Sequence, residues 1–210
     1  MRPKIDYTLY LVIDRNQMRA ASIEECVEQA VLGGCTVVQL REKEAPSREF
    51  YDIALRVREV TRRLNVPLII NDRADIAIAV SAEGVHVGQR DLPCSATRYI
   101  IGRDKVIGVS VSNFNEAVAA VEAGADYLGV GAMFSTGTKT DAELTSMNEL
   151  LHIRSEINIP IVVIGGINKS TLPRFKDARI DGIAVASAII SHRDAKSAAK
   201  ELKSMFLRLL

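Results

Sequence analysis

Short runs of apolar, mostly β-branched residues alternate with longer amphipathic stretches along the chain. Such runs, bounded by turn signals, are typical of strands buried on both faces, and the amphipathic stretches are typical of helices that cover them. The pattern predicts strands at Tyr7–Ile13, Thr36–Arg41, Pro67–Asn71, Gly84–Gly88, Val106–Val111, Tyr127–Gly131, Ile161–Gly165 and Gly182–Ala186. It predicts helices at Ile23–Leu32, Ser47–Leu64, Ala74–Val80, Ala96–Ile101, Asn115–Ala123, Ser146–Ile157, Thr171–Asp177 and Ala195–Leu209.

Capping residues support these boundaries. Ser22 and Glu25 in "SIEE" form a capping-box pattern, and Gly124 in "EAGADYLGV" is placed to end a helix before the next strand. Repeated strand–helix units within 210 residues, without a linker, predict a single (β/α)8 TIM barrel over residues 1–210. A doubly wound open sheet is the alternative, but it usually has fewer strands. The active site of a TIM barrel lies at the C-terminal ends of its strands.

Composition excludes few classes of protein but favours a soluble one. Hydrophobic residues make up 48% of the chain, charged residues 25%, and the net charge is +1, which gives no reason to expect nucleic acid or a membrane surface as partner. The N-terminal apolar run is too short to span a bilayer and lacks a signal-peptide cleavage site. Cys26, Cys35 and Cys94 have no metal-site spacing, so we expect reduced structural thiols and a cytoplasmic protein. Outer helices rich in Ala, Ile and Leu are compatible with a homo-oligomer.

The second predicted strand ends in a cluster of charge, "VVQLREK". Side chains alternate across a strand, so Gln39, Arg41 and Lys43 would share one face while Leu40 and Glu42 take the other. A solvated strand end is the simpler interpretation. Further amide and cationic residues follow other strands, however, and together they would suit a polyanionic substrate: Arg41, Lys43, Asn71 and Lys139.

Two carboxylates follow neighbouring strands, and they predict a metal site. Asp72 and Asp91 would repel a diphosphate unless a cation lay between them, and Mg²⁺ is commonly held by one or two carboxylates plus substrate phosphates. Each residue alone has another interpretation. Asp72 could cap the helix at Ala74, and Asp91 could form a turn before Pro93.

Small residues follow the last two strands. "GG" at 165–166 and "ASA" at 186–188 stand where TIM barrels often bind phosphate through backbone amides and a helix dipole. Thr136 and Thr138 in "STGTK" add hydroxyls. The sequence therefore predicts two anion sites, one assisted by metal and one built of backbone. That arrangement suits a transferase that brings a diphosphate ester to a monophosphate ester.

The motifs "VQLREK", "INDRADIA", "GVHVGQRDLP", "IGVS", "YLGVGAMFSTGTKTDA", "IGGI" and "GIAVASAI" resemble those of the thiamine phosphate synthase family over nearly the whole chain. The family joins hydroxymethylpyrimidine diphosphate to thiazole phosphate and releases diphosphate. The resemblance implies pyrimidine diphosphate contacts from Gln39, Leu40, Arg41, Glu42, Lys43, Asn71, Ser110 and Lys139, with Arg41, Lys43, Ser110 and Lys139 catalytic. It implies thiazole phosphate contacts from Thr136, Gly137, Thr138, Gly166, Ala186 and Ser187. It also implies Mg²⁺ held by Asp72 and Asp91.

The resemblance further implies a dissociative substitution, which needs a stabilised leaving group more than a general base. In keeping with this, no catalytic His or Cys set is evident. His86 is interpreted as a packed or hydrogen-bonded core histidine, and His152 and His192 as outer-helix residues. The chain departs from the family at Ala132, where proline is usual, and at Ser112, where histidine is frequent. Alanine also replaces a common valine at position 186.

Three alternatives stay open. A thiazole tautomerase-like relative would share the barrel but would not need the diphosphate site. A non-catalytic sensor of thiamine phosphates would keep the anion sites without needing Mg²⁺. Another phosphate-binding barrel, such as an aldolase or epimerase, would need a Schiff-base lysine or a metal-binding histidine set, and neither is evident.

Overall fold

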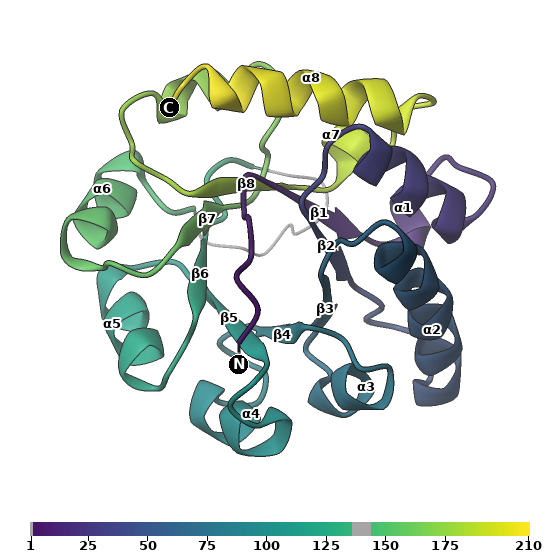
Figure 1. Cartoon of the computed structure of the whole chain (residues 1–210). Helices are drawn as coiled ribbons and strands as arrows, with labels where there is room; N and C mark the ends of the chain where they lie inside the picture. Colours follow the sequence, from purple (N-terminus) through teal and green to yellow (C-terminus); the bar gives the residue numbers. More distant parts are fainter. Residues whose placement is uncertain (1, 136–143) are drawn as a thin grey trace.

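Parallel strands close into a barrel in the computed structural model, which describes residues 2–135 and 144–210 (Figure 1). The strands are β1 Leu9–Ile13, β2 Val37–Leu40, β3 Leu68–Asn71, β4 Gly84–Val87, β5 Val106–Val111, β6 Tyr127–Val130, β7 Ile161–Val163 and β8 Gly182–Val185. Each pairs with the next in sequence, and β1 pairs with β8 through Leu9 and Ile183. The closure confirms the predicted (β/α)8 barrel and excludes the open sheet.

Helices surround the barrel on its outside (Figure 1). They are α1 Ile23–Leu32, α2 Ser47–Arg63, α3 Ala74–Ala79, α4 Cys94–Ile101, α5 Phe114–Glu122, α6 Met147–Glu156, α7 Ser187–Ile190 and α8 Ala195–Leu207, with 3-10 helices η1 Arg15–Gln17 and η2 Leu172–Phe175. Ser22 caps α1 as predicted, because its Oγ accepts a hydrogen bond from the Glu25 amide at 3.1 Å. None of the helices within these described ranges is long and apolar enough to cross a membrane.

Two elements differ from the prediction, both near the last strands, whereas the ends of the other predicted elements agree to within two residues. The helix predicted over Thr171–Asp177 is only the 3-10 turn η2, with Pro173 in its first turn and Asp177 at a φ of +66° just beyond its end. A left-handed residue cannot continue a helix. The short helix α7 follows β8 directly and was not predicted as an element. Four residues are too few to show helical periodicity.

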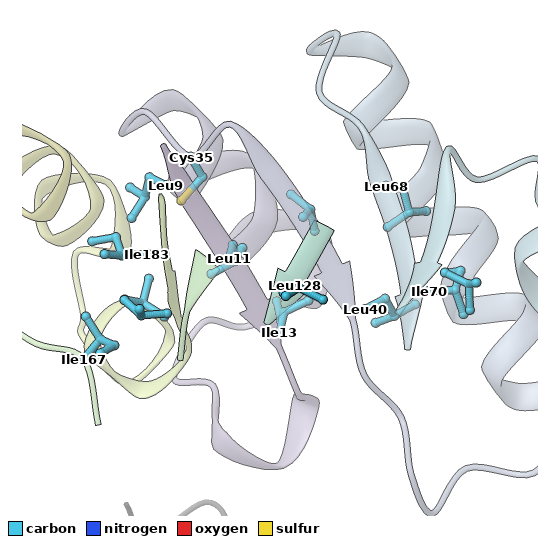
Figure 2. Close-up of a cluster of buried hydrophobic side chains, with 14 of the residues drawn as sticks. Leu9, Leu11, Ile13, Cys35, Leu40, Leu68, Ile70, Leu128, Ile167 and Ile183 are labelled. Atoms are coloured by element: carbon cyan, nitrogen blue, oxygen red, sulfur yellow. The ribbon is translucent and has the colours of Figure 1, made fainter. Parts of the chain in front are cut away.

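The strands separate two apolar regions because successive side chains point to opposite faces. Leu9, Leu11 and Ile13 of β1 point outward and pack under the helices, as Figure 2 shows. Tyr10 and Val12 of the same strand point into the barrel. This alternation decides which residues at the strand ends can reach a ligand inside the barrel mouth.

The three cysteines are buried free thiols, as predicted. Burial raises the pKa of the Cys26 thiol to about 11 and also raises the pKa of the Cys35 thiol. Both thiols are therefore poor nucleophiles at neutral pH, and their role is packing.

Candidate active site at the carboxyl end of the barrel

A cavity of about 300 Å³ opens at the C-terminal ends of the strands. It brings together residues that the sequence predicted as separate sets. The predicted site residues that line it are Gln39, Arg41, Asn71, Ser110, Gly166, Ala186 and Ser187. A cavity of this size suits small-molecule ligands.

Arg41 lines one side of the cavity. Four further charged residues do not line the cavity themselves but adjoin Arg41 or the lining residue Asn71: Asp14, Lys43, Asp72 and Asp91. We call these five residues the charged side. Arg41 Nη1 donates to Asp14 Oδ2 at 2.7 Å. Asp14 is only 8% exposed, and its other oxygen accepts from the Asn16 amide at the start of η1. The buried Asp14 carboxylate therefore fixes the position of the Arg41 guanidinium. The alternation of Tyr10, Val12 and Asp14 into the barrel could have identified Asp14 from sequence.

The predicted metal pair lies next to Asn71, the last residue of β3. Lys43 Nζ lies 3.0 Å from Asp72 Oδ2, while Asp91 Oδ2 accepts from the Gly88 amide at 2.8 Å. Asp72 does not cap α3, since the residue before that helix is Arg73 and no side chain caps it. Asp91 does hold a turn, as its simpler interpretation required.

Burial raises the pKa of the Asp72 carboxyl, as does its hydrogen-bonding contact with Asp91, whereas Lys43 opposes the rise. Two carboxylates in contact, one of them partly desolvated, are stabilised by a cation placed between them. The donor set therefore fits Mg²⁺, which takes oxygen ligands and completes its shell with water and phosphate. No larger cluster of acidic, His or Cys residues occurs in the ranges 2–135 and 144–210.

The opposite side of the cavity, which we call the backbone side, consists of Gly165, Gly166, Ala186 and Ser187. Gly165 and Gly166 have φ values of +94° and +66°. A Cβ at Gly166 would lie 2.7 Å from Phe134 Cβ, so only glycine fits there. Thr171 Oγ1 and Asn168 Nδ2 donate to the Gly166 carbonyl at 2.9 and 3.1 Å, which fixes this turn.

The backbone side offers amides rather than basic side chains. Ser187 begins α7, and the first amides of a helix have no partner within that helix. Such amides, with the glycine turn beside them, can bind a phosphate without a cationic side chain.

A hydrogen-bonded chain of side chains forms the floor of the cavity. Gln39 Nε2 donates to the Tyr10 hydroxyl at 2.9 Å, and the hydroxyls of Tyr10 and Tyr127 lie 2.7 Å apart. His86 Nδ1 lies 2.9 Å from the Tyr127 hydroxyl, and His86 Nε2 lies 2.8 Å from Ser110 Oγ. Burial raises the pKa of both tyrosines, so their hydroxyls stay neutral.

His86 therefore is hydrogen-bonded, as predicted, but it also lines the cavity. Sequence reasoning placed His86 in the core and did not include Tyr10 or Tyr127 in the site. A histidine and tyrosines at inward positions of strands were the available signal.

Some predicted contacts lie elsewhere. The Leu40 side chain points away from the barrel interior and is fully buried in the apolar cluster that also contains Leu9, Leu11 and Ile13 (Figure 2). The Glu42 carboxylate is held by Arg15, which donates through Nε and Nη2 at 2.9 Å each. Neither side chain lines the cavity, so a contact from either would have to use its backbone. Thr136, Gly137, Thr138 and Lys139 lie outside the described residues.

Two positions at which the chain departs from the family pattern, Ala132 and Ser112, make backbone hydrogen bonds in the loops that follow β6 and β5. Ala132 lines the cavity, and its carbonyl accepts from the Thr145 amide at 2.8 Å. Ser112 donates through its amide to Glu116 Oε2 at 2.8 Å, beyond the end of β5. Neither substitution removes a side chain from the charged side.

Comparison with known proteins gives a consistent result. A family model described as thiamine monophosphate synthase matches residues 9–189. The thiamine-phosphate synthase of Clostridium beijerinckii is 58% identical over 209 residues and covers all of both chains, and that of Ruminiclostridium cellulolyticum is 56% identical over 99% of both. The solved thiamine phosphate pyrophosphorylase from Pyrococcus furiosus has a TM-score of 0.90 at 37% identity, covering 98% of each chain. A 3-hexulose-6-phosphate synthase, at 19% identity and a TM-score of 0.68, shares the fold alone.

Proposed function

The chain belongs to the thiamine monophosphate synthase family, a family of transferases, and we propose that it joins hydroxymethylaminopyrimidine diphosphate to thiazole phosphate or its carboxylated form. The products are thiamine phosphate and diphosphate. When the carboxylated form reacts, CO2 is released as well, and a proton replaces it on the ring carbon. The observation that carries this proposal is that one cavity is lined by the Arg41 guanidinium and the Gln39 and Asn71 amides on one side, and by a glycine turn and a helix start on the other. Two phosphorylated reactants need two such anion sites.

The charged side would bind the diphosphate of the pyrimidine. Arg41 has five N–H donors and uses one of them on Asp14, so its fork remains available to phosphate oxygens. The Lys43–Asp72 pair is partly exposed, with Lys43 45% accessible, so it can exchange partners at little cost. We also assign Lys139 to this role from the family resemblance.

Asp72 and Asp91 would hold Mg²⁺. When bound, the metal supplies electrostatic stabilisation to the negative charge that grows on the departing diphosphate. Arg41 and Lys43 act on the same charge through hydrogen bonds, and their effect is greatest where water is excluded.

The backbone side would bind the thiazole phosphate through amides of Gly166, Ala186 and Ser187. The resemblance adds Thr136, Gly137 and Thr138 to this set. Binding both reactants in one cavity places the thiazole nitrogen near the carbon that carries the diphosphate, which removes most of the entropic cost of a bimolecular reaction.

The proposed reaction is a dissociative substitution. The C–O bond to the diphosphate breaks first, with electron density supplied by the aminopyrimidine, and the bonding pair leaves with the diphosphate. The lone pair of the thiazole nitrogen then forms the new C–N bond. Because that nitrogen carries no proton, the step needs no general base. Gln39, Asn71 and Ser110 would orient the pyrimidine ring.

The test is to incubate the purified protein with both reactants and Mg²⁺, and to follow thiamine phosphate and diphosphate by chromatography with and without a chelator. Equal amounts of both products, formed only with metal, are expected. Tight binding of thiazole phosphate without any product would refute the synthase and favour a tautomerase-like enzyme or a sensor.

A further inference from the structure

The side chains on the cavity floor form one unbroken hydrogen-bonded chain: Gln39, Tyr10, Tyr127, His86 and Ser110. The first and last members line the cavity, while Tyr10 and Tyr127 are 1% and 0% exposed. Every link is between 2.7 and 2.9 Å. The links join β2, β1, β6, β4 and β5, so the chain crosses the inside of the barrel.

The number of protons on each group determines the direction of donation along this hydrogen-bonded chain. The Gln39 amide nitrogen has no lone pair and must donate to Tyr10. The Tyr10 hydroxyl contacts Gln39 and Tyr127 among the described residues, so its single proton goes to Tyr127. The Tyr127 proton then goes to His86 Nδ1, and the ring proton of His86 sits on Nε2 and is donated to Ser110 Oγ. With the Gln39 amide in this orientation, the reverse order would leave its N–H facing the Tyr10 O–H, which is costly.

The direction decides what each end presents to a ligand. With its nitrogen bound to Tyr10, Gln39 keeps its carbonyl oxygen as an acceptor. Ser110 Oγ already accepts from His86, so its own proton is available for donation. The cavity therefore offers an acceptor at Gln39 and a donor at Ser110.

We propose that Tyr10, Tyr127 and His86 are positioning residues whose hydrogen-bonded chain orients the Gln39 amide and the Ser110 hydroxyl, and thereby selects an aminopyrimidine over its oxo analogue. An aminopyrimidine carries an N–H donor and a ring-nitrogen acceptor, which match the two ends. The oxo analogue would place a carbonyl oxygen against the Gln39 oxygen, and the amide cannot turn unless the whole chain reverses. The identity of the ring rests on the proposed function.

The neighbouring strands leave space for this chain. A Cβ at Gly108 of β5 would lie 2.1 Å from Tyr127 Cζ and 2.4 Å from His86 Nδ1. A Cβ at Gly129 of β6 would lie 2.9 Å from His86 Cε1. Glycines at these two inward positions allow the tyrosine and histidine rings to meet inside the barrel.

The decisive variant is Tyr127→Phe, which removes one hydroxyl from the middle of the chain. The readout is the ratio of inhibition constants of hydroxymethylaminopyrimidine and its oxo analogue, both without diphosphate. We expect the wild type to favour the amino compound at least ~10-fold, and Tyr127→Phe to lose most of this preference, since a polar site rejects a mismatched analogue through unpaired groups. The KM for thiazole phosphate should stay unchanged. Tyr10→Phe should reproduce the result.

The matched control is Tyr7→Phe. The Tyr7 ring packs 4.7 Å from the Tyr127 ring, but its hydroxyl is not part of the chain. This variant should keep the preference. Thermal unfolding and near-ultraviolet circular dichroism would show that all three variants are folded.

A second readout is independent of activity. Nitrogen-15 NMR of a variant with His152 and His192 replaced by Gln, which leaves His86 as the single histidine, reports which ring nitrogen carries the proton. We expect Nε2–H with the intact chain and a changed tautomer ratio after Tyr127→Phe. A proton on Nδ1 in the otherwise wild-type chain, or an unchanged preference in Tyr127→Phe, would overturn the inference. Selective binding of the aminopyrimidine without synthesis of thiamine phosphate would refute the proposed function alone.

Discussion

The two sides of the cavity are both suited to phosphate, but they differ in whether their phosphate-binding groups are paired with a counter-charge when no ligand is bound. Arg41 and Lys43 on the charged side already have carboxylate partners, Asp14 and Asp72. The backbone side consists of amides held by a glycine turn, which need no counter-charge. Charged side chains must exchange partners to bind a substrate, whereas fixed amides need only space.

This difference makes the two sides sensitive to different changes. The charged side should respond to loss of charge, to metal, to pH and to salt. The backbone side should respond to added volume and to backbone strain. The response of one side can therefore be measured with the other side as a reference.

The largest effect is expected from Arg41→Ala. It removes the guanidinium and leaves the Asp14 carboxylate, 8% exposed, without its partner. Loss of charged hydrogen bonds worth about 3 kcal/mol should lower kcat/KM for the pyrimidine diphosphate ~100-fold. The KM for thiazole phosphate should change little. Steady-state kinetics with each reactant varied in turn measures both.

Arg48→Ala is the matched control for this substitution. Arg48 lies on α2, its side chain is 87% exposed, and it pairs with Asp52 one turn away. Its kinetics should stay close to the wild type. Equal losses for both reactants in Arg41→Ala would contradict the division of the cavity into two sides.

Gly166→Ala should affect the backbone side next most strongly. Its φ of +66° disfavours alanine, and the new Cβ would displace Phe134, so the turn must move. We expect the KM for thiazole phosphate to rise about 10-fold and the free energy of unfolding to fall by ~1–3 kcal/mol. Gly124→Ala is the control, because Gly124 has a similar φ of +89° but no neighbour within 4 Å of the added Cβ. It should lower the free energy of unfolding without raising the KM for thiazole phosphate. A raised KM in Gly124→Ala would mean that backbone strain alone, and not a change at the backbone side, raises the KM in Gly166→Ala.

Asp72→Asn should separate metal binding from stability. The raised pKa means that the folded protein binds the Asp72 proton more tightly than the unfolded chain, whose carboxyl titrates near 3.8. Ionised Asp72 therefore lowers stability progressively as pH rises through its folded pKa. Without metal, Asp72→Asn should raise Tm at neutral pH by about 2–4 °C for each kcal/mol relieved.

Mg²⁺ should raise the Tm of the wild type at neutral pH and much less at pH values where Asp72 is protonated. Asp72→Asn should lose this response. Asp75→Asn is the control, because Arg73 lowers the pKa of Asp75 and its removal should not raise Tm or abolish the Mg²⁺ response. Scanning calorimetry of the wild type and both variants across pH, with and without Mg²⁺, measures these changes in Tm. A Tm insensitive to Mg²⁺ in the wild type would argue against the metal pair.

The smallest effect is expected from salt. Raising KCl from about 0.1 M to about 1 M shortens the Debye length from ~10 to ~3 Å. The KM for the pyrimidine diphosphate should rise several-fold, and that for thiazole phosphate should rise less, because amides in direct contact with phosphate are screened less. Potassium sulfate is unsuitable, since sulfate would compete as an anion. Equal increases in KM for both reactants would contradict the distinction between a charged side and a backbone side.

Much of the site was predictable because strand alternation is local. The inward direction of Gln39 and Arg41 follows from their spacing, and the structure has both residues lining the cavity. The outward direction of Leu40 follows from the same rule, yet the family resemblance had included it among the contacts. The rule and the resemblance differ there because a resemblance transfers positions and does not say whether side chain or backbone makes a contact.

The sequence by itself determined the order of strands and helices, the barrel and the face of each strand that turns inward, because these depend on the period of nearby residues. Only the tertiary structure decided the partners: Asp14 for Arg41, Arg15 for Glu42, and the tyrosines that link Gln39 to His86 and Ser110. Each of these pairs joins residues on different strands or on the loops that follow them. Their meeting depends on the register in which the barrel closes, and no local pattern in the chain carries that information.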